Sequence, residues 1–341
     1  MHLKFPSITS FKDVFASQTY RPDSACPLDY GMKIKLHGAN VAVRLRPAEA
    51  PVAQSRNQDL CETDDPYGFH GWLQARSELW ARAGRQDTTL TFYGEWAGPG
   101  VAKGDAVQQT GKKRFYIFAL GLGEWPHHQN PDIATPRWMI TCPLKIRAFL
   151  PEDILGDDVR ILPWETGEPV VFDFTDPSGI AEQLAVLNRA VDQVAVCDPY
   201  IARTFGISHP GEGFVLVPVS SYEEQVSAAY FARTAFKAKT EKHRVRGTAR
   251  AASVHEPLPA TAADFIATFC TQARLTQALE EVCQGRADIR QTGAMITWMT
   301  GDVEKEGFAE ISALCVPPER LKADIAEAVR SWFVPRAKAQ M

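Results

Sequence analysis

The chain has 341 residues, which at about 150 residues per domain suggests two domains. Hydrophobic residues make up 45% and charged residues 23%, so a packed core is expected and wholesale disorder is excluded. The 37 Lys and Arg against 41 Asp and Glu give a formal net charge of −4, which excludes a uniformly cationic coat for binding nucleic acid.

No stretch of the sequence approaches the roughly 20 apolar residues that span a bilayer. The beginning of the sequence shows no long apolar run followed by a small-residue cleavage site, so no secretory signal is expected. The seven cysteines are scattered and none forms a CxxC pair, which argues against a zinc knuckle or a disulfide framework. We therefore expect an intracellular, cytoplasmic protein that does not enter a membrane.

Short runs of strand-forming residues dominate the first two thirds of the chain. Residues 32–36 and 41–45 flank a four-residue turn that contains Gly38, and this pattern predicts a hairpin. Further runs of the same kind predict strands at 90–96, 114–120, 169–174 and 213–219.

Helical patterns lie between these strands and fill the end of the chain. Apolar residues recur at 3–4 spacing over 180–194, and residues 71–84 are typical of a second helix that ends at Gly84. After residue 250 a Pro/Ala-rich stretch is typical of a linker, and a later helix from about 318 is expected to stop at Pro335. These patterns predict two domains, at residues 1–248 and 259–341, of which the second is all-helical.

Residues suited to phosphate and nucleotide chemistry recur at strand ends. Lys35 closes a strand before a glycine turn, which places an amine at the rim of a pocket. Alone, this pattern is more typical of a solvated lysine before an ordinary turn. Other side chains of this kind follow along the chain. They are the guanidinium of Arg56, the carboxylate of Glu95 before a glycine-rich loop, and the ring of Phe118 in an aromatic strand. The carboxylate of Glu212 between two glycines comes next, and Lys237 and Lys239 lie on one face of a strand.

In this order the motifs resemble the covalent nucleotidyltransferases, which include ATP-dependent DNA and RNA ligases and mRNA capping enzymes. His37, where DNA ligases and capping enzymes carry Asp, is similar to the RNA ligase 2-like branch of phage nick-sealing and RNA-editing ligases. Asn40, the GEWAGPG loop and the GEG-V segment resemble the same branch. The resemblance covers residues 30–240 and implies an α+β fold: a nucleotidyltransferase core of antiparallel sheets with flanking helices, followed by a small helical domain.

The resemblance also implies a role for each motif residue. Lys35 is expected to attack the α-phosphate of ATP and form a lysyl-AMP, with Lys237 and Lys239 disfavouring its charged form and neutralising phosphate charge. Glu95 is expected to bind the ribose hydroxyls, and Phe118 to stack on the adenine. Glu212 is expected to hold Mg²⁺ or Mn²⁺, since a carboxylate is a hard oxygen ligand.

Residues around Lys35 complete the expected nucleotide site. Ile34 and Leu36 flank the lysine, and Asn40 together with Arg56 is expected to engage phosphates or the sugar of an RNA end. His37 has two readings of equal weight, a role in the reaction and the stabilisation of the turn. Where the phage member carries an acid, Ile34 offers no side-chain acceptor to the base, and Ala119 follows Phe118 where the family often has Asp. The resemblance therefore does not by itself imply strict selection of ATP over GTP.

The activity that the resemblance implies is RNA ligation, as in RNA repair. The expected partners are RNA ends bearing 5′-phosphate and 3′-hydroxyl groups, on a nicked duplex or a single strand, and the expected state is a monomer. The basic residues between Arg233 and Arg250 favour a surface that tracks phosphates. The alternatives are a DNA ligase or another polynucleotide nucleotidyltransferase, and a non-sealing protein that binds nucleic-acid ends.

Overall fold

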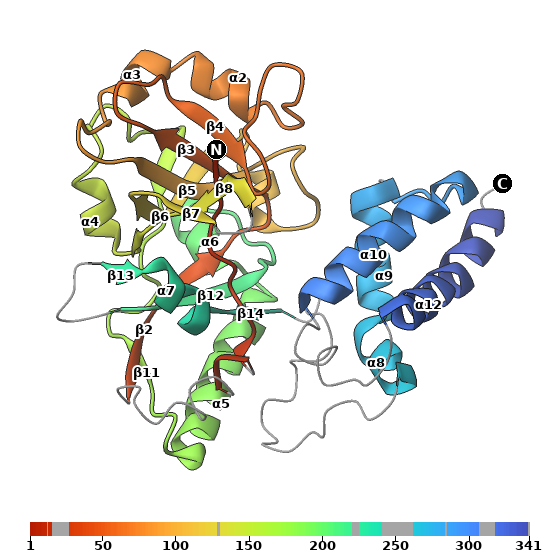
Figure 1. Cartoon of the computed structure of the whole chain (residues 1–341). Helices are drawn as coiled ribbons and strands as arrows, with labels where there is room; N and C mark the ends of the chain where they lie inside the picture. Colours follow the sequence, from red (N-terminus) through yellow and green to blue (C-terminus); the bar gives the residue numbers. More distant parts are fainter. Residues whose placement is uncertain are drawn as a thin grey trace. The chain divides into compact units, whose positions relative to one another are not determined.

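The computed structural model describes residues 1–11, 13–15, 27–127, 130–219, 225–240, 262–283, 285–306 and 318–339. The chain divides into two compact units, Met1–Thr240 and Glu241–Met341, whose elements are labelled in Figure 1. The expected domain boundary, the linker and the basic residues after Lys239 lie outside the described residues.

The first unit is a mixed α+β fold in which most strand pairs are antiparallel. Its largest sheet consists of β13 (Val226–Ser227), β9 (Trp138–Ile140), β6 (Arg114–Leu122), β5 (Leu90–Ala97), β3 (Ala39–Leu45) and β4 (Val52–Ser55), with β10 (Val159–Ile161) parallel to β6. A second sheet has the order β11 (Val170–Phe172), β2 (Leu28–Lys35), β12 (Gly213–Pro218) and β14 (Phe236–Lys239). A third joins β1 (His2–Leu3), β8 (Asn130–Thr135) and β7 (Trp125–His127).

The expected hairpin over residues 32–45 is wrong, because its two strands belong to different sheets. β2 pairs with β12, whereas β3 pairs with β5 and β4. The chain crosses between the sheets at Gly38, where a Cβ atom would lie 2.6 Å from the carbonyl oxygen of Trp96. A turn pattern reports local backbone geometry and not the strand that each arm pairs with. The crossing brings the end of β2 next to the start of β3.

Helices of the first unit begin and end where local chemistry dictates. α5 (Pro177–Val194) confirms the helix predicted over 180–194, and Asp176 caps it by accepting from the Ser178 N–H. The single helix predicted over 71–84 is wrong, because Arg76 leaves helical geometry at φ −127° and ψ 15° and splits it. Further helical segments are α2 (Phe69–Gln74), α3 (Ser77–Ala81), η1 (Ala106–Gln109), α4 (Pro143–Arg147), α6 (Pro199–Phe205) and α7 (Ala228–Thr234).

The described part of the second unit is helical, with the elements α8 (Ala262–Phe269), α9 (Gln272–Cys283), η2 (Ile289–Gln291), α10 (Thr292–Glu306) and α12 (Pro318–Ala339). The expected stop at Pro335 is wrong, since α12 runs on to Ala339. A proline inside a helix costs about 3 kcal/mol. Phe333 and Ala337, on either side of it, are fully buried in the helical core, and their burial offsets that cost. Among the described residues, no helix is long and apolar enough to cross a membrane.

Candidate active site

Three strands of the four-stranded sheet bring the predicted nucleophile and its partners together. Gly213 lies opposite Lys35 on one side and opposite Lys239 on the other. A Cβ at Gly213 would meet the Ala238 carbonyl oxygen at 2.1 Å, and its φ of +142° also requires glycine. This close approach sets Glu212 directly between the two lysines.

Glu212 forms the centre of an ion-pair cluster. Its Oε2 lies 2.6 Å from Lys35 Nζ, and its Oε1 lies 3.5 Å from Lys239 Nζ. The carboxylate is 6% exposed, so the pairing takes place largely out of water, where opposite charges attract strongly. Lys35, Glu212 and Lys239, which are widely separated in the sequence, thus form one cluster.

The lysines of this cluster share one face of the sheet with two others. Lys33 and Lys237 both lie opposite Val215, one on each neighbouring strand. Because side chains two residues apart point to the same side of a strand, all four lysines lie on a single face. Ile34 points to the other face and is 2% exposed, so its side chain does not join the cluster. Leu36 is likewise buried in the core.

Lys33 is a site residue that the sequence interpretation missed. Its Nζ donates to the carbonyl oxygen of Phe118 at 2.8 Å and lies 4.8 Å from the centre of the Trp164 ring. The side chain is buried, and this burial lowers the pKa of Lys33 to about 7. The alternation of lysines at 33 and 35 is the signal that was available.

Phe118 lies on the seven-stranded sheet, at an irregularity of the pairing between β5 and β6. Tyr93 pairs with Ala119 and Gly94 with Ile117, so Phe118 is left as the extra residue of a β-bulge. Its ring is half-buried and packs edge-on against Phe5 at 5.2 Å between centroids. The carbonyl contact with Lys33 is the described link between this residue and the lysine face.

Glu95 and Asn40 lie opposite each other at one end of the seven-stranded sheet. Glu95 Oε1 accepts a hydrogen bond of 3.0 Å from the N–H of Gly38, in the crossing after Lys35. Burial raises the pKa of Glu95 to about 7, although the nearby Lys35 acts in the opposite direction. Arg56 follows Ser55, which pairs with Val41, and so leaves the sheet at the end where Asn40 lies.

His37 is held on both its ring and its backbone. Its Nδ1 lies 2.8 Å from the buried carboxylate of Asp105, and its carbonyl accepts from Gln108 Nε2 at 2.7 Å. Burial opposes the charged ring, but the hydrogen bond to Asp105 and the carboxylate of Glu212 outweigh it and raise the pKa of His37. These contacts fit the turn-stabilising reading. Asp105 and Gln108 were missed, since neither belongs to a recognisable motif.

The described side chains fit a divalent cation only if substrate phosphates supply further oxygen ligands. Among the described residues, no group of three or more His, Cys, Asp or Glu side chains could hold a metal ion. Mg²⁺ is commonly bound by one or two carboxylates together with substrate phosphates, and the buried Glu212 supplies one such carboxylate.

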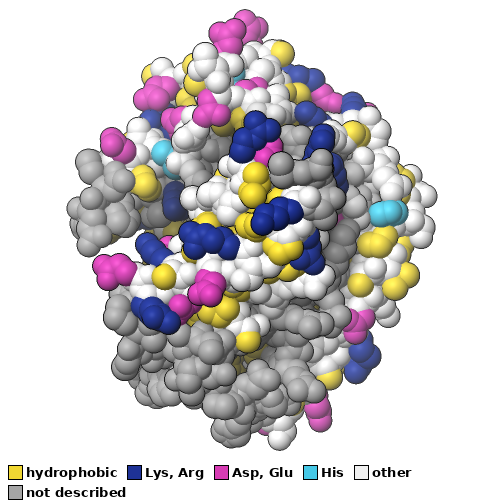
Figure 2. All heavy atoms as spheres, turned by 90° about the vertical axis from the view of Figure 1, so that its right-hand side faces the viewer, with side chains coloured by type: hydrophobic (Ala, Val, Ile, Leu, Met, Phe, Trp, Pro, Cys, Tyr) yellow, Lys and Arg dark blue, Asp and Glu magenta, His cyan; other side chains and the backbone are white. Residues whose placement is uncertain are grey.

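The charge of the surface is uneven despite the net charge of −4. Figure 2 shows several Lys and Arg side chains close together near the middle of the visible face, with Asp and Glu mostly toward its edges. A net charge of −4 therefore does not exclude local positive charge of the kind that attracts phosphates.

Comparisons with known proteins give a family match over more than half of the chain. The family model for RNA ligase matches residues 32–239, a range that contains every predicted site residue. No curated protein matches the chain.

Two solved structures of Naegleria gruberi RNA ligase are similar to the chain. One is a lysine-to-alanine variant with ATP and Mn, 14% identical with a TM-score of 0.41, over 70% of this chain and 56% of the other. The second is a lysine-to-methionine variant with AMP and Mn, 13% identical with a TM-score of 0.43, over 71% and 59%. The match therefore spans less than two thirds of either Naegleria chain.

Proposed function

We propose, because the chain belongs to the RNA ligase family, that it seals RNA ends in three steps that begin on Lys35. The lysine amine attacks the α-phosphate of ATP, so that an N–P bond forms while the bond to pyrophosphate breaks. The AMP then passes to the 5′-phosphate of an RNA end. Finally a 3′-hydroxyl attacks that phosphate, the strand is joined and AMP leaves.

The ion-pair cluster around Glu212 is the observation that carries this proposal. An amine must lose its proton before it can attack, and the carboxylate of Glu212 accepts a hydrogen bond of 2.6 Å from Lys35 Nζ. Glu212 thus aligns the resting lysine, and its carboxylate can accept the proton that the amine loses. A divalent cation bound by Glu212 and the phosphates would neutralise charge on the nucleotide.

The other lysines of the same face act on the phosphates. Lys237 and Lys239 lie on β14 with their side chains on the Lys35 side of the sheet. Phosphoryl transfer depends mainly on positioning and on stabilising charge, so these cations favour the departure of pyrophosphate. Glu95 binds the ribose hydroxyls and Phe118 supports the adenine, each from the neighbouring sheet.

RNA binds at the other side of the crossing. Asn40 and Arg56 lie at one end of the seven-stranded sheet, near Glu95. A guanidinium binds phosphate oxygens through two N–H groups at once, which suits Arg56 to the phosphate of an RNA end. The turn at His37 connects the lysine face around Lys35 to the sheet end that carries Asn40 and Arg56, and it fixes their relative position.

The proposal is tested by covalent labelling. The purified chain is incubated with labelled ATP and Mg²⁺, denatured and examined for bound label, with Lys322→Ala as a matched surface control. We expect label on the wild type and on the control, and none on Lys35→Ala. Undiminished label on Lys35→Ala, or none on the wild type, would contradict the mechanism. Nicked RNA, single-stranded RNA and nicked DNA with matching ends then separate RNA ligation from DNA ligation.

A further inference from the structure

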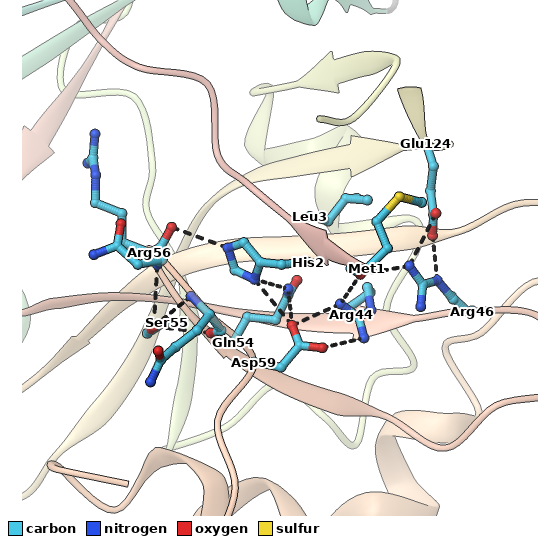
Figure 3. A network of polar contacts seen from close by, with 12 residues as sticks. Met1, His2, Leu3, Arg44, Arg46, Gln54, Ser55, Arg56, Asp59 and Glu124 are labelled. Atoms are coloured by element: carbon cyan, nitrogen blue, oxygen red, sulfur yellow. Dashed lines mark hydrogen bonds and ion pairs between the residues drawn. The ribbon is translucent and has the colours of Figure 1, made fainter. Parts of the chain in front are cut away.

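The N-terminal strand β1 reaches the seven-stranded sheet through a partly buried polar network, shown in Figure 3. β1 pairs in parallel with β8, while the side chain of His2 lies against β3 and β4. The imidazole is only 8% exposed and contacts Gln54, Asp59 and the backbone of Arg56. None of these contacts serves the nucleotide chemistry described above.

The contacts of His2 define how its ring is oriented. Its Nε2 lies 3.2 Å from the carbonyl oxygen of Arg56, and because a carbonyl only accepts, Nε2 carries a proton. Gln54 Nε2 lies 2.6 Å from His2 Nδ1 and 2.6 Å from Asp59 Oδ1. The Gln54 amide thus lies between the ring and the carboxylate, and Nδ1 of the ring is also 3.2 Å from Asp59 Oδ1. Nε2 of the ring is left to donate to the Arg56 carbonyl.

The far side of the network is rigid. Arg44 donates to both oxygens of Asp59, at 3.0 and 2.9 Å, and its side chain is 4% exposed. A two-pronged pairing of this kind fixes both partners in one geometry. Gln54, which lies on β4, is therefore anchored at the same place as the ring that it orients.

The backbone of Arg56 lies in the turn after β4, directly beside this network. It follows the last residue of β4 in a tight turn that is closed by a bond of 2.8 Å between Ser55 N and the carbonyl of Gln58. In Figure 3 the backbone carbonyl of Arg56 faces His2, whereas its side chain points away from the network. The contact of His2 with the Arg56 carbonyl thus constrains the backbone from which the guanidinium extends.

We propose that His2 is a positioning residue for the RNA end, which holds the Arg56 backbone so that the guanidinium meets an RNA phosphate. The inference rests on the proposed function, since it deepens the role of Arg56 in that reaction. It assigns to β1 a part in the two steps that use RNA, and none in the formation of lysyl-AMP.

The chain offers a matched control at the other end of the same network. Arg46 pairs with Glu124 at 2.6 Å and also donates to the Met1 carbonyl at 2.9 Å. This contact tethers β1 but does not touch Arg56. Glu124→Gln therefore weakens the tether of the strand and leaves the His2–Arg56 contact in place.

The test separates the reaction into its parts. Lysyl-AMP formation is followed with ATP alone, and the sealing step with RNA whose 5′ end already carries AMP, for His2→Ala, His2→Gln and Glu124→Gln. We expect His2→Ala to form lysyl-AMP as the wild type does but to seal about tenfold to a hundredfold less efficiently, chiefly through a higher KM for RNA. His2→Gln, which keeps an N–H donor, restores part of the loss, and Glu124→Gln behaves as the wild type.

A double-mutant cycle ties the effect to Arg56. If His2 acts through that residue, His2→Ala combined with Arg56→Ala seals no worse than Arg56→Ala alone. Fully additive losses, unchanged sealing by His2→Ala, or an equal loss of lysyl-AMP formation would each overturn the inference. A wild type that forms no lysyl-AMP would instead contradict the proposed function itself.

Discussion

Two carboxylates of the first unit are each paired with basic side chains, which are lysines at Glu212 and an arginine at Asp59. Glu212 is 6% exposed and is paired with two lysines, each through one nitrogen. Asp59 is 37% exposed and is gripped by both terminal nitrogens of Arg44. A lysine is a point charge on a flexible stem and can change partners, whereas the arginine fork fixes its partner.

Under the proposed mechanism, the difference separates a reactive cluster from a structural one. In the mechanism proposed above, Lys35 must leave Glu212 to attack ATP, so a pairing that can open is required there. In the network around Asp59 nothing has to move, and a rigid pairing keeps β1, β3 and β4 in place. The variants below test whether the two carboxylates really divide the work in this way.

The largest effect is expected at Glu212. Glu212→Gln keeps the shape but removes the charge that aligns Lys35 and takes its proton, so lysyl-AMP formation falls about a hundredfold or more. The rate of label transfer from ATP measures this. The melting temperature serves as the control, and a rate close to that of the wild type would show that the cluster is not reactive.

The opposite pattern is expected at Asp59. Asp59→Asn leaves the buried Arg44 without its ionic partner, and the free energy of unfolding falls by about 1–3 kcal/mol. Lysyl-AMP formation by the folded protein stays unchanged. Denaturant unfolding together with the labelling assay checks both parts. A loss of lysyl-AMP formation without a loss of stability would reverse the roles that the comparison gives to the two carboxylates.

A pH dependence of stability is expected from Lys33. The folded protein releases this proton at about pH 7, and the unfolded chain only near the ordinary value of 10.5. Between these values the unfolded state binds more protons, so stability rises with pH. Relative to Lys33→Met, the wild type gains at most about 1.4 kcal/mol per pH unit from pH 7 to 10. A difference in unfolding free energy that stays constant over this range would contradict the burial of a titrating Lys33.

A smaller effect of opposite sign is expected from Glu95. Its pKa of about 7 in the folded state lies above the ordinary value of 4.5, so the folded state binds more protons between these values. Stability of the wild type relative to Glu95→Gln therefore falls as the pH rises from 4.5 to 7, by less than about 1 kcal/mol per pH unit. Urea unfolding at several pH values measures it, and a rising difference would contradict the assignment.

The proposed reactive cluster could be selected from the sequence, whereas the network around Asp59 could not. Lys35, Glu212 and Lys239 stand in short motifs that resemble those of the covalent nucleotidyltransferases, and that resemblance selected them. Contacts across sheets left no such trace. Lys33 meets Phe118 over 85 positions and His37 meets Asp105 over 68, and no local pattern encodes either pairing.

Local patterns also failed where tertiary packing decided the outcome. The strands around Gly38 have the pattern of a hairpin, yet each pairs with strands supplied later in the chain. The helix over 71–84 breaks at Arg76, and α12 passes through Pro335. In each case local preference predicts an element, and the burial of distant residues determines its bounds and its neighbours.

The most direct test of the central claim is to locate the adenylate on the protein. After incubation with ATP and Mg²⁺, the chain is digested and its peptides are examined by mass spectrometry. The account predicts one AMP on the peptide that carries Lys35, removed by acid as expected of a phosphoramidate, and absent from Lys35→Ala. An adenylate on a different lysine, or none on the wild type, would contradict it.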